Sequence, residues 1–210
     1  MKPRIYLDNN ATTPTDSRVV DAMMPYYTEK FGNAASRNHP FGWEAEEAVE
    51  NARKVIANEL SCRSREIVFT SGATESVNLA IKGYCERNIH RGKHIVTQVT
   101  EHKAVLDTCS ELEKRGWEVT HVPVMKDGLV DFHELTSVIR DDTVLVAIMH
   151  ANNEIGTVND ITAIGKLCGE RDARFFVDAA QSFGKLAVDV ESMNIDMLAA
   201  SGHKIYGPKG

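Results

Sequence analysis

The chain has 210 residues, 42% of them hydrophobic and 26% charged, so it is long enough to bury a core as one soluble domain with a small appendage. The formal charge is −6 and no basic tract stands out, which argues against nucleic acid as a partner. The longest apolar run, residues 144–149, is far shorter than the ~20 residues that cross a bilayer. We therefore expect no membrane contact, no secretory signal and a cytoplasmic protein.

Residues 1–17 contain two prolines, two adjacent asparagines and three threonines, which predicts extended chain and turns in a separate structural unit, the amino-terminal arm. From about residue 40 onward, apolar runs alternate with amphipathic segments, the pattern of an α/β domain whose sheet is covered on both faces. Helices are predicted at residues 43–60, 74–88, 102–115, 131–140 and 159–172. Strands are predicted at residues 66–70, 94–98, 118–122, 143–150, 174–178 and 196–200.

The four cysteines are too far apart in sequence to form a Cys-x-x-Cys pair, which argues against a zinc ribbon or a thioredoxin-like redox site. They are Cys62, Cys85, Cys109 and Cys168. We expect free thiols in a reducing compartment.

Ligands of doubly wound sheets bind beyond the carboxyl ends of the strands, so the polar residues there are the candidates for a binding site. The segment 70–76, with a Gly turn and hydroxyl side chains at a helix start, could bind a phosphate. The alternative is an ordinary capped helix, with Ser71 or Thr74 as the cap.

Asp178 could be a metal ligand, a helix cap or the partner of a protonated heterocyclic nitrogen. Lys204 could form an imine and carry a proton, or be a solvated surface lysine.

Two further polar groups follow strands on the same predicted edge. His102 could lie flat against an aromatic cofactor or simply cap a helix, and the segment 152–156 places amide donors nearby. The spacing of Gly202 and Gly207 resembles a P-loop, but Pro208 stands where that motif needs lysine. Neither a Gly-x-Gly-x-x-Gly nor a His-Glu-x-x-His motif occurs. Together, the strand-end groups match the needs of pyridoxal phosphate.

With these residues assembled, the chain resembles the pyridoxal-phosphate-dependent cysteine desulfurases of the NifS/IscS kind, which are class V aminotransferases of the aspartate-aminotransferase-like fold. Seven motifs carry the resemblance: YLDNNATTP at 6–14, FGN at 31–33, TSGATES at 70–76, EHKA at 101–104, NNEIG at 152–156, VDAAQS at 177–182 and SGHKIYGPKG at 201–210. It implies a three-layer αβα fold of type I with a mostly parallel sheet. It also implies that residues 1–17 belong to a small domain and that residues 18–210 form the large cofactor domain.

The resemblance also implies a role for each site residue. Lys204 would bind the cofactor as an imine, Asp178 would pair with its pyridine nitrogen, His102 would stack on its ring and Gln181 would contact its phenolic oxygen. The phosphate would be held by Ala73, Thr74, Ser201 and His203, and Asn153 would lie beside the cofactor and the substrate carboxylate. No metal is expected.

The implied reaction converts L-cysteine to L-alanine and leaves the sulfur as a persulfide on the enzyme, for iron–sulfur cluster and thio-cofactor assembly. A homodimer and a sulfur-acceptor scaffold protein are the implied partners. Family members continue beyond the lysine with a nucleophilic-cysteine loop, so we expect a truncated chain that is inactive in sulfur transfer by itself. Two alternatives stay open. One is a selenocysteine lyase or another pyridoxal phosphate enzyme of this fold; the other is an incomplete fragment that only folds or binds.

Overall fold

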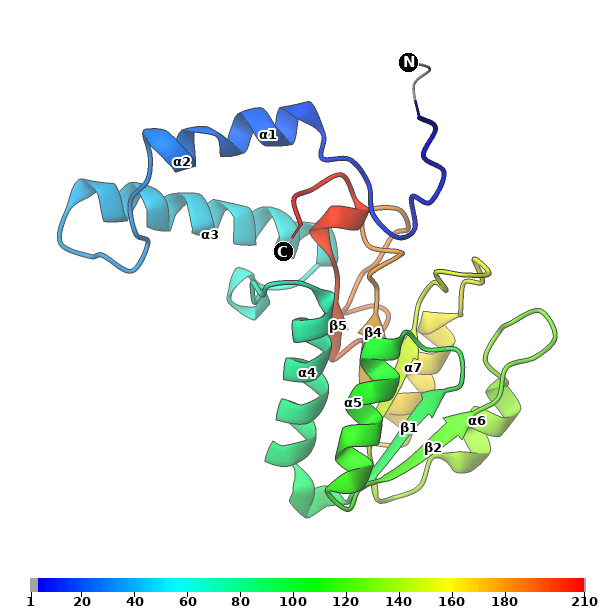
Figure 1. Cartoon of the computed structure of the whole chain (residues 1–210). Coiled ribbons are helices and arrows are strands. Elements are labelled where there is room, and N and C mark those ends of the chain that lie inside the picture. Colours follow the sequence, from blue (N-terminus) through cyan, green and yellow to red (C-terminus); the bar gives the residue numbers. More distant parts are fainter. Residues whose placement is uncertain (1–3, 210) are drawn as a thin grey trace.

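A computed structural model describes residues 4–209 as a parallel sheet between two layers of helices (Figure 1). The sheet has five strands in the order β2-β1-β3-β4-β5, and every neighbouring pair is parallel. The strands are β1 (His94–Gln98), β2 (Glu118–Val122), β3 (Thr143–Met149), β4 (Arg174–Asp178) and β5 (Met197–Ala199). This architecture confirms the predicted α/β class.

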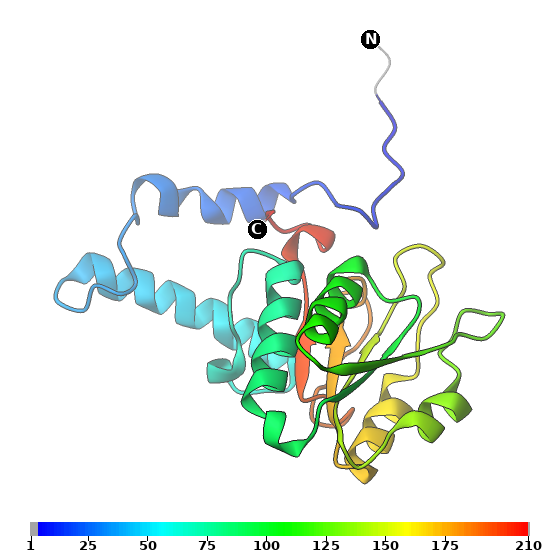
Figure 2. The ribbon, with the colours of Figure 1, turned by 60° about the horizontal axis from the view of Figure 1, so that its bottom comes forward.

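Helices cover both faces of the sheet, as Figures 1 and 2 show. The helices are α1 (Ser17–Met23), α2 (Pro25–Thr28), α3 (Pro40–Leu60), α4 (Ala73–Arg87), α5 (Lys103–Lys114), α6 (Phe132–Val138) and α7 (Ile161–Glu170). Three short 3-10 turns accompany them: η1 (Ser64–Glu66), η2 (Ile89–Arg91) and η3 (Gly202–Lys204). Among residues 4–209, no helix has the length and hydropathy of a membrane span.

Alternation along the central strands explains the two layers, because successive side chains of a strand point to opposite faces. In β1, Ile95 joins the apolar cluster under α4 and α5, while Val96 joins the cluster under α6 and α7. In β3, Leu145 and Val146 divide in the same way. All residues of β3 are buried, so this strand reads in sequence as one continuous apolar run.

The predicted strand at residues 66–70 is wrong. Residues 64–66 form η1, and the extended residues 67–70 have no ladder partner among the described residues. A groove of about 1250 Å³ separates this segment from β5 and is lined by Val68 and Phe69 on one side and Met197 and Leu198 on the other. Strands pair only at a spacing of about 4.8 Å, so the β-like composition of this segment cannot produce a ladder across the groove.

The first helices project from the domain. Figures 1 and 2 show α1, α2 and the beginning of α3 extending away from the sheet, and neither α1 nor α2 contains a buried residue. Apolar side chains are exposed along this projection at Tyr27, Phe31, Phe41 and Trp43. Four exposed aromatic side chains therefore gather on this projecting segment.

The amino-terminal arm has no regular structure over residues 4–16 and passes beside the carboxyl-terminal segment (Figure 1). Residues 1–3 of the arm and Gly210 of the last motif lie outside the described residues. The division into a small domain at 1–17 and a large domain at 18–210 stays a prediction.

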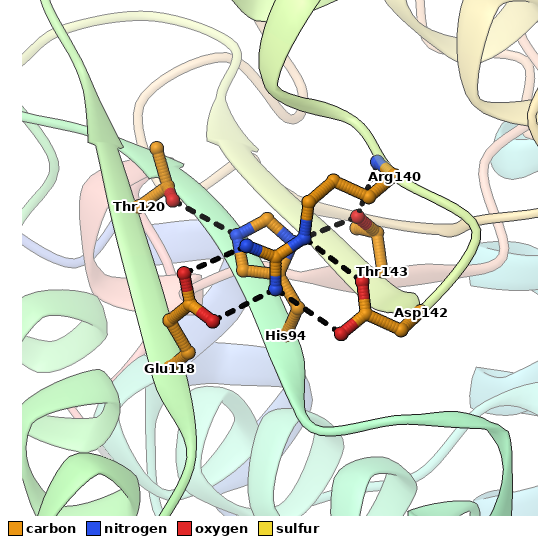
Figure 3. Close-up of polar contacts among 6 residues, drawn as sticks. All are labelled: His94, Glu118, Thr120, Arg140, Asp142 and Thr143. Atoms are coloured by element: carbon orange, nitrogen blue, oxygen red, sulfur yellow. Dashed lines mark hydrogen bonds and ion pairs between the residues drawn. The ribbon is translucent and has the colours of Figure 1, made fainter.

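A polar cluster occupies the amino-terminal end of the sheet (Figure 3). Its members are His94, Glu118, Thr120, Arg140, Asp142 and Thr143. His94 is fully buried, and its two ring nitrogens lie 2.8 Å from the hydroxyls of Thr143 and Thr120. Arg140 forms hydrogen bonds with Glu118 and Asp142 beside it. The imidazole therefore links β1 to both neighbouring strands, at the end of the sheet remote from the candidate site.

Candidate active site

One recess at the carboxyl ends of the strands brings together six of the predicted site residues. They are Ala73, His102, Asn153, Asp178, Gln181 and Lys204. They come from the start of α4, the start of α5, the loop after β3, the end of β4, the loop after β4, and η3. Parallel strands end at a common edge, so residues far apart in sequence meet there.

Asp178 and Lys204 form the charged centre of the recess. Asp178 is buried at the end of β4, and its Oδ1 accepts a hydrogen bond from the backbone N–H of Ala180 at 2.9 Å. Burial raises the pKa of Asp178, while this hydrogen bond and the charges of His102 and Lys204 act in the opposite direction. Burial also lowers the pKa of Lys204, partly offset by Asp178. Burial in the recess thus disfavours the charged form of both groups, while the attraction between their opposite charges partly offsets this effect.

His102 and Asn153 flank this pair from neighbouring loops. His102 is the N-cap of α5, where its Nδ1 accepts a hydrogen bond from the N–H of Ala104 at 3.1 Å. His102 therefore does cap a helix, as one of the two predicted alternatives has it. The ring also lines the recess. Asn153 donates its side-chain amide to Glu154, and its backbone carbonyl accepts a hydrogen bond from the side chain of Asn10.

Gln181 provides the test of whether a ligand fits this recess. Its Nε2 donates to the carbonyl of Asn10 at 2.8 Å, while its buried Oε1 has no hydrogen-bond partner. Buried polar atoms are nearly always paired in native proteins, so an orphaned amide oxygen in a recess marks a place for a polar ligand group. With an amine, a buried carboxylate, a flat imidazole and this amide, the recess has groups for each polar position of a pyridoxal ring.

The residues predicted to bind phosphate lie beside the recess. The N-cap of α4 is Gly72, with φ +143° and no side chain to bond the free N–H groups of the first turn. Ser71 bonds instead to Glu75 through its hydroxyl and N–H, so the alternative of a Ser71 cap is wrong. Thr74 is exposed in the first turn and is not the cap either. The uncapped start of a 15-residue helix suits an anion.

Ser201 and His203, the other predicted phosphate ligands, flank Gly202 before Lys204. Ser201 is buried and lines the groove that also includes Gly72. The Nδ1 of His203 lies 3.1 Å from the Thr12 hydroxyl, and burial, with the charges of Lys204 and Lys209, lowers its pKa. The structure therefore places Thr74, Ser201 and His203 near the recess, outside the set of residues that line it.

Sequence reasoning missed two kinds of residue at this site. The amino-terminal arm contacts the site through Asn10 and Thr13, although the composition of the arm suggested a separate unit. Glu101 is fully buried, and one of its oxygens accepts a hydrogen bond from the N–H of Met149 at 2.6 Å. Burial raises the pKa of Glu101 well above its ordinary value, and Asp178 adds to this effect. All three residues lie inside the motifs at 6–14 and 101–104, which was the available signal.

The four thiols lie outside the recess. All are free, and three of them, Cys85, Cys109 and Cys168, are buried. Burial raises the pKa of each of these three to about 12. Cys62 is half-buried, and burial raises its pKa as well. A thiol needs a lowered pKa and access to act as a nucleophile, so these positions fit incidental or core cysteines.

Sequence comparison identifies the family. The sequence model for aminotransferase class V matches residues 5–210. The chain belongs to this family. Its members are pyridoxal phosphate enzymes, which agrees with the predicted cofactor and with the groups that line the recess.

Within this family, the chain is similar to relatives and solved structures that carry more specific names. Cysteine desulfurase IscS of Neisseria meningitidis serogroup C / serotype 2a is 59% identical over 210 residues, covering all of this chain and 52% of the relative. IscS of Escherichia coli O139:H28 is 57% identical over 212 residues, with the same coverage. A solved NifS-like protein superposes with a TM-score of 0.96 at 41% identity, over 99% of this chain and 57% of its own. The structure titled "SspA in complex with cysteine" superposes with a TM-score of 0.95 at 44% sequence identity, and the match covers 99% of this chain and 59% of that one. The chain thus spans about half the length of the curated relatives it matches.

Proposed function

We propose that this chain is the cofactor-binding part of a cysteine desulfurase, which converts L-cysteine to L-alanine and transfers the sulfur. The observation that carries the proposal is that Lys204 and buried Asp178 line one recess, where the charge of each affects the pKa of the other. The relatives named cysteine desulfurase, which match the whole chain, support the choice of reaction.

Four side chains would hold the ring of pyridoxal phosphate. Lys204 would bind it covalently, because a lowered pKa increases the neutral, nucleophilic fraction of the amine. Asp178 would pair with the pyridine nitrogen and keep it protonated. His102 would stack on the ring and Gln181 would contact the phenolic oxygen. Two of these groups support the assignment directly, since Asp178 is buried and Gln181 has an orphaned oxygen.

The phosphate would lie at the start of α4. The backbone N–H groups of Ala73 and Thr74, with the Thr74 hydroxyl, donate to it, helped by the positive end of the helix dipole. Ser201 and His203 complete the site from the segment that carries Lys204. The missing side-chain cap at Gly72 supports this placement.

The bound cofactor supplies an electron sink that makes the α-carbon of the amino acid acidic. Lys204 would move the proton at that carbon, and burial, which lowers the pKa of its amine, favours the neutral form that accepts a proton. Asp178 would keep its negative charge at the pyridine nitrogen. Asn153 would contact the substrate carboxylate and orient the amino acid.

Sulfur transfer requires a cysteine thiolate that attacks the substrate sulfur. The buried thiols of this chain do not suit that step, because burial raises their pKa to about 12. We propose that a loop beyond residue 210 supplies the nucleophile and that residues 1–210 by themselves do not transfer sulfur.

We also propose that the protein is a cytoplasmic homodimer that passes sulfur to an acceptor protein such as an iron–sulfur scaffold. The projecting α1–α3 segment supports the dimer, since large aromatic side chains exposed together mark association surfaces. Tyr27, Phe31 and Trp43 are each more than half exposed there.

Two other functions have support of their own. A selenocysteine lyase, a cysteine sulfinate desulfinase or an aminotransferase would use the same recess, because its residues are assigned to the cofactor and the substrate carboxylate, which these reactions share. A folding or binding unit without catalysis is favoured by the groove beside β5, which leaves one edge of the sheet without a neighbouring strand.

The cofactor assignment is tested by borohydride reduction after incubation with pyridoxal phosphate, followed by peptide mapping. We expect the label on Lys204. Lys204→Ala removes it, while the matched control Lys185→Ala, a lysine close enough to influence Lys204 electrostatically, retains it. A label on another lysine in the wild-type protein contradicts the assignment.

The reaction is tested in the full-length protein by measuring alanine formed from L-cysteine, L-selenocysteine and L-cysteine sulfinate. A desulfurase forms alanine and protein-bound persulfide from L-cysteine with the highest kcat/KM of the three. A higher kcat/KM for one of the other substrates selects the lyase or desulfinase, and transamination without alanine release selects an aminotransferase.

A further inference from the structure

The loop that carries the reactive lysine is held by a residue almost two hundred positions earlier in the chain. We define the lysine loop as residues 202–207. Thr13 is buried, and its hydroxyl donates to the carbonyl of His203 at 2.9 Å while accepting from the N–H of Tyr206 at 2.9 Å. Its backbone N–H also donates to the His203 carbonyl at 2.9 Å. Thr13 thus bridges the backbone on both sides of Lys204.

The lysine loop adopts a conformation that needs such support. Tyr206 has φ +65°, the left-handed region that side chains other than Gly, Asn and Asp rarely adopt. The loop closes tightly, with the N–H of Gly207 donating to the carbonyl of Gly202 at 2.9 Å. Sparsely populated backbone states persist only where surrounding contacts over-determine them. Here Thr13 bonds the N–H of Tyr206, and the N–H of Asp16 donates to its carbonyl at 3.0 Å.

The same segment contacts the other loops of the site. The carbonyl of Asn10 accepts a hydrogen bond from Gln181, and its side chain donates to the carbonyl of Asn153 at 3.1 Å. Residues 10–16 therefore connect three of the loops that line the recess. A segment with these contacts belongs structurally to the site of the large domain.

We propose that Thr13 is a positioning residue, which fixes the lysine loop so that the amine of Lys204 stays in the recess opposite Asp178. The inference rests on the proposed function, because it concerns the lysine assigned to the cofactor. A valine at this position fills nearly the same volume and leaves the His203 carbonyl and the Tyr206 N–H without their side-chain partner. The loop then relaxes from the left-handed turn, and water reaches the amine.

The test uses the full-length protein and follows the capture of pyridoxal phosphate by Lys204 as a function of pH, by borohydride trapping and peptide mapping. Thr13→Val is expected to weaken cofactor affinity about tenfold, the effect of losing about one net buried hydrogen bond. The midpoint of the pH profile for capture moves to higher pH, because a hydrated amine regains its ordinary pKa. Thr13→Ser keeps the hydroxyl and restores both values to within about twofold of the wild type.

A matched control is Thr136→Val, a half-buried threonine in α6 whose hydroxyl donates to the carbonyl of Phe132 in the same helix. It should change neither value. If Thr13→Val fails to fold, Thr13→Ala removes the same bridge without adding volume. A Thr13 variant that lowers the melting temperature but leaves the pH midpoint and affinity unchanged overturns the inference. A wild-type protein that traps no label on Lys204 overturns the proposed function instead, so the two failures are distinct.

Discussion

His94 should make the fold sensitive to acid, and His94→Leu removes this sensitivity. The imidazole is fully buried at the start of β1, and both ring nitrogens are paired with threonine hydroxyls. Leucine keeps much of the volume but leaves the hydroxyls of Thr120 and Thr143 without that partner. The Thr143 hydroxyl retains the N–H of Arg140, at 2.8 Å. At about 1 kcal/mol for each net hydrogen bond, the variant should unfold with a free energy about 2 kcal/mol lower at pH 8.

The pH dependence follows from the direction of the pKa shift. Burial, followed by the charge of Arg140, lowers the pKa of folded His94, while Glu118 and Asp142 act in the opposite direction. The unfolded chain therefore binds a proton to this histidine near pH 6.5 while the folded protein does not. Stability is fully present above that pH and is lost as the pH falls toward the folded pKa. The wild type loses this stability and His94→Leu does not, so the difference between them shrinks in acid.

Equilibrium urea unfolding at pH 8 and pH 5, followed by far-ultraviolet circular dichroism, measures the difference. The other histidines are present in both proteins, so their contributions cancel in the difference between the two unfolding free energies. The matched control is His121→Leu, an exposed histidine on β2, which should change the unfolding free energy by less than about 0.5 kcal/mol at either pH. A difference between wild type and His94→Leu that stays constant or grows from pH 8 to pH 5 would refute the reasoning.

Three further predictions concern the site, the packing and the thiols. Asp178→Asn should lower alanine formation by the full-length protein at least about a hundredfold in steady-state assays, because a neutral amide cannot hold a protonated pyridine nitrogen. Gly165→Ala should lower the unfolding free energy by about 1–3 kcal/mol in urea titrations, since its Cβ would lie 2.0 Å from the carbonyl oxygen of Met193. Gly169→Ala in the same helix meets nothing within 4 Å and should stabilise by about 0.5–1 kcal/mol. Timed labelling with a disulfide reagent should modify Cys62 first and the three buried thiols only on unfolding.

The sequence predicts a strand correctly where the strands that pair with it in the sheet also stand out in the sequence as apolar runs. The predicted strand at 143–150 and the observed β3 differ at one end only, because a fully buried strand is apolar throughout. The segment 66–70 has the same kind of composition, but a ladder requires a neighbouring strand, and among residues 4–209 no strand pairs with this segment, which lines a groove together with β5. Pairing is a property of two segments, so composition within one of them could not decide the outcome.

The candidate site was predictable for a different reason. A parallel sheet brings every strand end to one edge, so identifying the strands also identifies the loops that meet. Asp178 and His102 follow directly from that rule. The roles of the side chains do not, since His102 both caps α5 and lines the recess. Separating these roles requires the direction of the ring, which depends on the fold around it.

The position of the amino-terminal arm could not be predicted from the sequence. Its composition indicates irregular structure, and irregular structure carries no period from which a docking position can be read. The position is set by hydrogen bonds that join Thr13 to the lysine loop, across 190 residues and more. Such contacts require the sheet to hold the lysine loop in place, whereas the sheet is built from residues outside the arm. Weakening the arm should therefore loosen Lys204 before it unfolds the domain.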